Sequence, residues 1–229
     1  SAIAVATERQ WEDYRTDGTL DHRDLTVALR ALRRLVREGR HELDVDETIR
    51  STARNAGEIE LVERRQRENQ VHLVLLMDAG GSMAPHARRV EQLFTAAAEI
   101  RTFRSLTTWM FHNVPYQWLW RDYATNTRTP TAEVLAGLTD RHRLIFVGDA
   151  SMAPYELFSA MGFGAEDRRS GLDWLRAFRE RCPSSVWLNP DPKSWWDHPT
   201  VSAIGAVFPM FELNVEGLRE GVKRLRRAV

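Results

Sequence analysis

A near-continuous apolar run, residues 71–77, followed directly by Asp78 and a glycine-rich turn, constrains the fold of this chain more than any other feature. Such a run is typical of a parallel strand that is buried on both faces. In open α/β sheets, the ligand crevice lies beyond the carboxyl ends of strands of this kind. We therefore expect the functional site around Asp78.

Strand-like and helix-like stretches alternate from residue 71 to the C-terminus. We expect strands at 71–77, 106–111, 116–120, 144–147, 185–188 and 208–213. Helices are expected at 85–103, 130–138, 155–161, 172–181, 201–206 and 215–227. This alternation predicts an α/β fold that is doubly wound, with a mainly parallel sheet covered by helices on both faces.

The first third of the chain has a helical pattern instead. Apolar residues recur at helical spacing over residues 25–36, with Asp21 or Thr19 as the cap and Gly39 as the stop. A second helix is expected from Asp44, with Glu47 three residues later as in a capping box, to the glycine at position 57.

An edge strand at residues 59–62, followed by a charged connector, is expected to lead into the α/β region. We place a boundary near Gly57. The predicted organisation is an N-terminal helical segment, residues 1–57, and an α/β domain, residues 58–229.

Composition excludes several classes of partner and cofactor. The 32 basic and 32 acidic side chains give a formal charge of zero, so we expect no nucleic-acid or anionic-membrane footprint. Cys182 is the one cysteine, which excludes an internal disulfide and a multi-cysteine metal site. No apolar run approaches the roughly 18 residues of a membrane span, and we expect a soluble, cytoplasmic protein.

Oxygen-bearing side chains fall where the chain should leave strands or enter helices on one edge of the sheet. Asp78 and Ser82 follow the first core strand, Thr129 and Thr131 precede a helix, and Asp149 follows the strand at 144–147. Two carboxylates and several hydroxyls suit Mg²⁺, Mn²⁺ or Ca²⁺ rather than zinc or copper. Each residue also has a simpler role, since Asp78, Ser82 and Thr129 could cap helices and Asp149 could stabilise a turn.

Residues 75–83 resemble the first loop of the von Willebrand factor A (VWA) domain, in which a strand ends in Asp-x-Ser-x-Ser. In that family a later Thr and a later Asp complete a metal-ion-dependent adhesion site (MIDAS). The ligands that the resemblance implies here are Asp78, Ser82, Thr129 or Thr131, and Asp149. Gly80 departs from the family pattern, because a serine that contacts the metal usually stands there. A water would have to replace that ligand, which should lower the metal affinity.

The resemblance covers residues 71–229. Within the family, the bacterial CoxE-like group is most similar, particularly at residues 75–83, 147–157 and 187–190. Members of that group carry a helical segment before the VWA domain and are associated with MoxR-type AAA+ ATPases. Some are linked to the maturation of metalloenzymes such as carbon monoxide dehydrogenase.

The resemblance implies a non-enzymatic protein-protein interaction module. In this family the ion keeps an exchangeable coordination position for a carboxylate of a partner protein. We expect the chain to act with a MoxR-type AAA+ ATPase in the assembly or maturation of a client complex, using Mg²⁺ or, alternatively, Mn²⁺ or Ca²⁺.

Two other functions remain open. In the first, Asp78 would be the nucleophile of a haloacid-dehalogenase-like phosphohydrolase, but such enzymes need a second carboxylate two residues later, where this chain has Gly80. In the second, the chain is a metal-free structural scaffold that docks through its helical segment.

Overall fold

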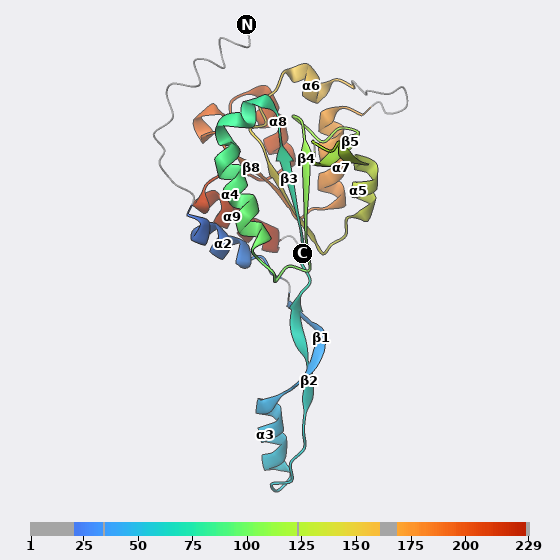
Figure 1. Cartoon of the computed structure of the whole chain (residues 1–229), viewed down its shortest axis with the longest axis vertical. Helices are drawn as coiled ribbons and strands as arrows, with labels where there is room; N and C mark the ends of the chain where they lie inside the picture. Colours follow the sequence, from blue (N-terminus) through green and yellow to red (C-terminus); the bar gives the residue numbers. More distant parts are fainter. Residues whose placement is uncertain (1–20, 34, 123, 161–168, 228–229) are drawn as a thin grey trace.

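The computed structural model describes residues 21–33, 35–122, 124–160 and 169–227. These residues form a seven-stranded sheet in the order β6-β5-β4-β3-β7-β8-β9 and a separate two-stranded sheet, β1-β2 (Figure 1). Helices cover both faces of the larger sheet. The predicted doubly wound α/β fold is therefore confirmed.

The large sheet is mainly parallel. Its strands are β3 (His72–Asp78), β4 (Ser105–Phe111), β5 (Trp118–Asp122), β6 (Thr127–Pro130), β7 (His142–Val147), β8 (Ser185–Asn189) and β9 (Met210–Glu212). β3 pairs in parallel with β4 and β7, and β7-β8 and β8-β9 are also parallel. β5 is antiparallel to β4 and to β6, a short strand that the sequence pattern did not predict. The carboxyl ends of β3, β6 and β7 consequently lie at the same edge of the sheet.

The helices between these strands largely follow the predicted pattern. They are η1 (Gly81–His86), α4 (Ala87–Ala98), α5 (Thr131–Gly137), α6 (Pro154–Phe158), α7 (Gly171–Arg181), η2 (Lys193–Trp195), α8 (Pro199–Val207) and α9 (Val215–Arg227). The helix predicted over 85–103 begins instead with a 3₁₀ turn and ends at Ala98. It ends early because the chain must return to the sheet, where Arg104 N donates to Val71 O at 2.9 Å just before β4.

Alternating side chains of β3 build two apolar cores, one on each face of the sheet. Leu73 and Leu75 pack with α4 and α9, whereas Val74 and Leu76 face the aromatic core beneath α7 and α8. All four are buried. The apolar side chains of β3 thus pack into the cores on both faces of the sheet, as expected for a central parallel strand.

Trp187 is the centre of the aromatic core. Its ring stacks on Phe146 with centroids 5.4 Å apart, and it is fully buried. Its indole Nε1 donates to Gly148 O at 2.7 Å. Because a buried indole N–H needs an acceptor, this bond fixes the backbone just after β7, one residue before Asp149.

The first predicted helix is shorter than expected. α2 (His22–Arg30) is capped by Asp21, whose carboxylate accepts from Arg23 N at 2.9 Å. It ends at Arg30 rather than Gly39, because the following residues form β1 (Leu35–Leu43). Strand pairing with β2 (Glu63–Asn69) overrides the helical spacing there.

The second predicted helix is confirmed, but the predicted edge strand at 59–62 is wrong. α3 (Val45–Arg54) starts at Asp44, whose carboxylate accepts from Glu47 N at 3.1 Å. The strand that follows is β2, beginning at residue 63. Val62, just before β2, forms hydrogen bonds with the start of α3 instead. Its N–H donates to Thr48 Oγ1 at 3.0 Å, and its carbonyl oxygen accepts from Asp44 N at 2.7 Å.

The N-terminal third divides between the body and a projecting arm. α2 packs on α4 and α9, and its buried Leu25 and Leu29 belong to the same core as β3. β1, α3 and β2 form the arm, which extends from the end of the body opposite α6 (Figure 1). The helix predicted to lie in a separate segment is therefore part of the packing of the α/β body.

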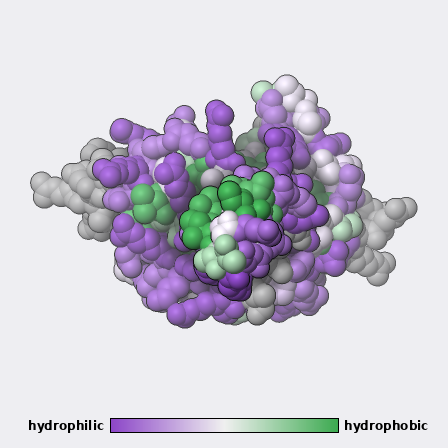
Figure 2. Space-filling view, turned by 90° about the horizontal axis from the view of Figure 1, so that it is seen from below, coloured by the Kyte–Doolittle hydropathy of each residue, from purple (hydrophilic) through white to green (hydrophobic). Residues whose placement is uncertain are grey.

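Large apolar side chains are exposed on the arm. They are Leu43, Val45, Ile49, Ile59 and Leu61, with exposed fractions between 46% and 77%. Figure 2 looks at the molecule from the arm end and shows hydrophobic surface gathered among hydrophilic side chains. No helix in the described ranges is long and apolar enough to cross a bilayer.

Candidate functional site

The predicted ligands follow the carboxyl ends of β3, β6 and β7, and among the described residues contacts link Asp78, Ser82 and Asp149 but not Thr131. We call this the carboxyl-edge site and define it by Asp78, Ser82, Thr131 and Asp149. Asp78 is the last residue of β3, Thr131 directly follows β6, and Asp149 lies two residues after β7. Burial differs sharply among them, since Ser82 is exposed and the other three are buried.

Asp78 is a buried carboxylate with one oxygen satisfied and one free. Oδ1 accepts from Gly80 N at 2.8 Å and from Asn113 N at 3.0 Å. Oδ2 is buried and has no hydrogen-bond partner in the described part of the chain. Desolvation, with a smaller contribution from the nearby charge of Asp149, raises the pKa of Asp78 to about 6 against the opposing effect of the two N–H donors.

Asp149 is held in a similar environment. Its Oδ1 accepts from Ser151 N at 2.9 Å, and the Ser82 hydroxyl also hydrogen-bonds to its side chain. Burial raises the pKa of Asp149, while these two hydrogen bonds oppose the rise. Asn189 Nδ2 donates to Asp149 O at 2.8 Å and so fixes the loop. Asp78, Ser82 and Asp149 therefore interact as one cluster.

The two candidate threonines differ in their surroundings. Thr131 is fully buried, its N–H donates to Gln117 O at 2.9 Å, and its Oγ1 has no hydrogen-bond partner among the described residues. Thr129 is half-buried and pairs with Leu119 within the β5-β6 ladder. A buried hydroxyl without a partner is rare and needs an explanation, which favours Thr131 as the ligand candidate.

Three residues next to the site carry polar contacts that the sequence pattern did not single out. Asn113 and Glu156 are joined by a hydrogen bond of 2.8 Å from the Asn113 amide to Glu156 Oε1. Asp191, in the loop after β8, lies 3.1 Å from His86 Nε2 and raises the pKa of Asp149. All three lie in segments that follow strands, but nothing in their residue types or spacing distinguished them in the sequence.

The donor set fits a hard divalent cation. Asp78 Oδ2 and Thr131 Oγ1 are buried oxygens that lack partners, and both belong to residue types that Mg²⁺ or Ca²⁺ accepts as ligands. The described residues contain no group of three or more His, Cys, Asp and Glu side chains arranged to hold a metal. Any cation here would therefore rest on two carboxylates supplemented by hydroxyl, carboxamide or water oxygens.

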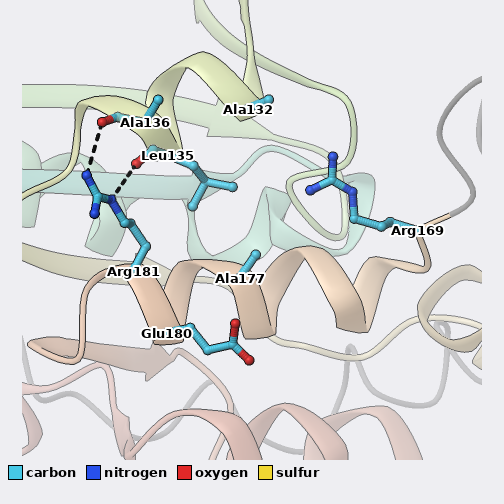
Figure 3. A pocket seen from close by; sticks show the side chains of 7 residues that line it. All are labelled: Ala132, Leu135, Ala136, Arg169, Ala177, Glu180 and Arg181. Atoms are coloured by element: carbon cyan, nitrogen blue, oxygen red, sulfur yellow. Dashed lines mark hydrogen bonds between the residues drawn. The ribbon is translucent and has the colours of Figure 1, made fainter.

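A pocket of about 490 Å³ lies away from this site, between α5 and α7 (Figure 3). Its lining includes alanine and leucine side chains together with Arg169, Glu180 and Arg181. Arg181 donates to Leu135 O and Ala136 O, both at 3.3 Å, at the end of α5. The pocket shares no residue with the carboxyl-edge site.

The mainly parallel sheet with helices on both faces is consistent with a VWA-type or Rossmann-like α/β domain. Residues 20–113, less than half of the 229-residue chain, match the family described as VWA domain containing CoxE-like protein. Over these residues the chain is similar to the VWA domain containing CoxE-like proteins. The match includes α2, the arm, Asp78 and Ser82, whereas Thr131 and Asp149 lie beyond it. No curated protein and no solved structure matches the chain.

Proposed function

We propose that this VWA domain is a non-enzymatic interaction module that binds a hard divalent cation, Mg²⁺ in the first place, at the carboxyl-edge site. The observation that carries the proposal is the pair of buried oxygens without partners, Asp78 Oδ2 and Thr131 Oγ1. Leaving buried polar atoms unsatisfied is costly, and a cation would compensate both.

The residues that would hold the cation are Asp78, Ser82, Thr131 and Asp149. A bound cation supplies positive charge and an exchangeable position for a carboxylate of a partner protein. Asp78 and Asp149 repel each other when both are ionised, and their buried setting raises both pKa values. The chain's own residues thus create a site that favours a cation.

The partner surface is proposed to include α6, which adjoins the site. Tyr155 and Phe158 on this helix are 57% and 46% exposed. Glu156, between them, accepts the hydrogen bond from Asn113, whose N–H binds Asp78. Exposed aromatic side chains are frequent anchors of protein interfaces, so these two rings would flank a partner carboxylate.

The similarity to CoxE-like proteins suggests a MoxR-type AAA+ ATPase and its client as partners. The alternative of a metal-free scaffold is favoured by one observation, the exposed apolar side chains of the arm. A phosphohydrolase is not favoured, because residue 80 would need a carboxylate, and even a Cβ there would lie only 3.1 Å from Asn113 Oδ1 and Asp78 Oδ1.

Co-purification with the AAA+ ATPase, in Mg²⁺ and in EDTA, tests this function. Deleting the first helices would not be a clean experiment, because α2 buries Leu25 and Leu29 in the main core. We would instead compare Thr131→Val, which removes the partnerless hydroxyl with little change of shape, with the arm variant Ile49→Ser/Ile59→Ser.

We expect wild type and the arm variant to capture the ATPase in Mg²⁺. Capture should be lost in EDTA and in Thr131→Val. If EDTA and Thr131→Val leave capture of the ATPase unchanged but the arm variant abolishes it, the metal-free scaffold would be established instead.

A further inference from the structure

Gly80 occupies the position at which VWA domains usually have a metal-binding serine, and its backbone does not require glycine. Its φ of −62° and ψ of 159° are extended values that any residue adopts. Space is the constraint: a Cβ at residue 80 would lie 3.1 Å from Asn113 Oδ1, 3.1 Å from Asp78 Oδ1 and 3.2 Å from His112 Nδ1. The volume into which a side chain would project is therefore already lined by other polar atoms.

The carboxamide of Asn113 has a defined orientation. Its Nδ2 donates to Glu156 Oε1 at 2.8 Å, and an ionised carboxylate only accepts hydrogen bonds, so the amide nitrogen must face Glu156. Glu156 is itself held, because its Oε2 accepts from Ala153 N at 2.9 Å. Asn113 Oδ1 must consequently point the other way, toward Gly80 and Asp78.

The backbone of Asn113 is equally constrained. Its φ is 63°, in the left-handed region that asparagine tolerates better than most residues. In this conformation its N–H donates to Asp78 Oδ1 at 3.0 Å. One residue thus supports the key carboxylate through its backbone and directs a neutral oxygen into the same space through its side chain.

We propose that Asn113 Oδ1 replaces, as a cation ligand, the serine hydroxyl that residue 80 lacks. This inference rests on the proposed metal site. A carboxamide oxygen is a hard ligand of the kind that Mg²⁺ and Ca²⁺ bind. Gly80 and Asn113 then form a compensating pair, because the glycine leaves the room that the asparagine oxygen uses.

The pair predicts that Gly80→Ser alone does not improve cation binding. The new side chain would collide with the Asn113 carboxamide instead of adding a ligand. Shortening residue 113 should remove the contact with its carboxamide, leaving those with Asp78 and His112, so Gly80→Ser combined with Asn113→Gly should recover part of the affinity that Asn113→Gly loses.

The decisive variant is Asn113→Gly, because glycine keeps both the positive φ and the N–H donated to Asp78 while removing the carboxamide. Asn126→Gly is the matched control, since Asn126 is exposed in a turn with a φ of 51°. Mn²⁺ is the probe, with free Mn²⁺ measured by electron paramagnetic resonance. Asn113→Gly should weaken binding about tenfold or more, and Asn126→Gly should leave it unchanged.

Glu156→Gln tests the orientation argument without removing the ligand oxygen. The glutamine amide offers donors, so the Asn113 carboxamide is free to turn its nitrogen toward the site, and Mn²⁺ binding should weaken. Circular dichroism and urea unfolding of each variant show whether it remains folded.

The inference is overturned if wild type binds Mn²⁺, Thr131→Val abolishes binding, and Asn113→Gly binds as tightly as Asn126→Gly. In that case the proposed metal site stands and only the role of Asn113 fails. Wild type that binds no Mn²⁺ would refute both together.

Discussion

Gly148 approaches Asp78 so closely that a Cβ built on residue 148 would lie 2.9 Å from Asp78 Cβ. The Cβ built on residue 148 would also lie 3.2 Å from Trp187 Cζ2. Only a glycine therefore lets the end of β7 contact the end of β3. Asp78 is buried where the two strand ends approach each other, and burial raises its pKa.

Gly148→Ala should destabilise the fold because its Cβ has nowhere to go between two buried side chains. We expect the free energy of unfolding in urea to fall by about 1–3 kcal/mol, the usual cost of overpacking a core. Gly137→Ala is the control, since nothing lies within 4 Å of a Cβ there. Equal stability of the two variants would refute the proposed close contact.

Asp78→Asn should stabilise the metal-free protein at neutral pH. The folded-state pKa of about 6 exceeds the ordinary 3.8, so Asp78 binds its proton more tightly when folded. The resulting stability is fully present below about pH 4 and is lost as the pH rises through 6. The contribution of Asp78 to the free energy of unfolding therefore differs by about 3 kcal/mol between pH values well below 4 and well above 6.

Urea unfolding of wild type and Asp78→Asn in EDTA, from pH 4 to pH 7.5, measures how the Asp78 carboxylate changes the free energy of unfolding. Asp149 is present in both proteins, so the part of its raised pKa that comes from burial cancels in the comparison. The variant should gain stability over wild type as the pH rises. A gap between the two proteins that does not change with pH would mean that Asp78 has an ordinary pKa.

The aromatic rings of α6 give a prediction about partner binding. The double variant Tyr155→Ser/Phe158→Ser should weaken binding of the proposed AAA+ ATPase partner about tenfold or more, because two exposed anchors are removed. Mn²⁺ affinity should be unchanged, since neither ring belongs to the carboxyl-edge site. Biolayer interferometry would measure the first and electron paramagnetic resonance the second. A variant with unaltered affinity for the ATPase would exclude α6 from the interface.

Much of the body could be predicted because its sequence pattern and tertiary environment agree. The run at 71–77 is apolar on both faces, as a central strand requires, and β3 is buried on both faces. α9 has the predicted bounds, with Leu218, Val222 and Leu225 buried on one face. In these elements local spacing and global packing favour the same structure.

The arm could not be predicted because its stability depends on long-range pairing. Leu35 and Val36 have helical spacing with the residues before them, yet they pair with Asn69 and Glu68 of β2, more than thirty residues later in the chain. β6 was missed for a similar reason, since residues 127–130 form a strand only because β5 lies beside them. Pairing energy of this kind is absent from any local pattern.

The motif singled out Asp78, Ser82 and Asp149, whose side chains interact with one another in the structure. The motif did not decide between Thr129 and Thr131 as the candidate ligand. The two differ in burial, since Thr131 is fully buried and Thr129 is half-buried. Asn113 carried no recognisable signal, because its importance comes from the space beside Gly80 and from its bond to Glu156.

Titration with Mn²⁺ of wild type, Thr131→Val and Thr129→Val tests the central claim most directly. Valine matches threonine in shape and removes only the hydroxyl, and both variants carry the same exchange two residues apart. The account predicts that wild type and Thr129→Val bind one Mn²⁺ with similar affinity and that Thr131→Val loses binding. Absence of binding in wild type, or equal binding in all three proteins, would contradict it.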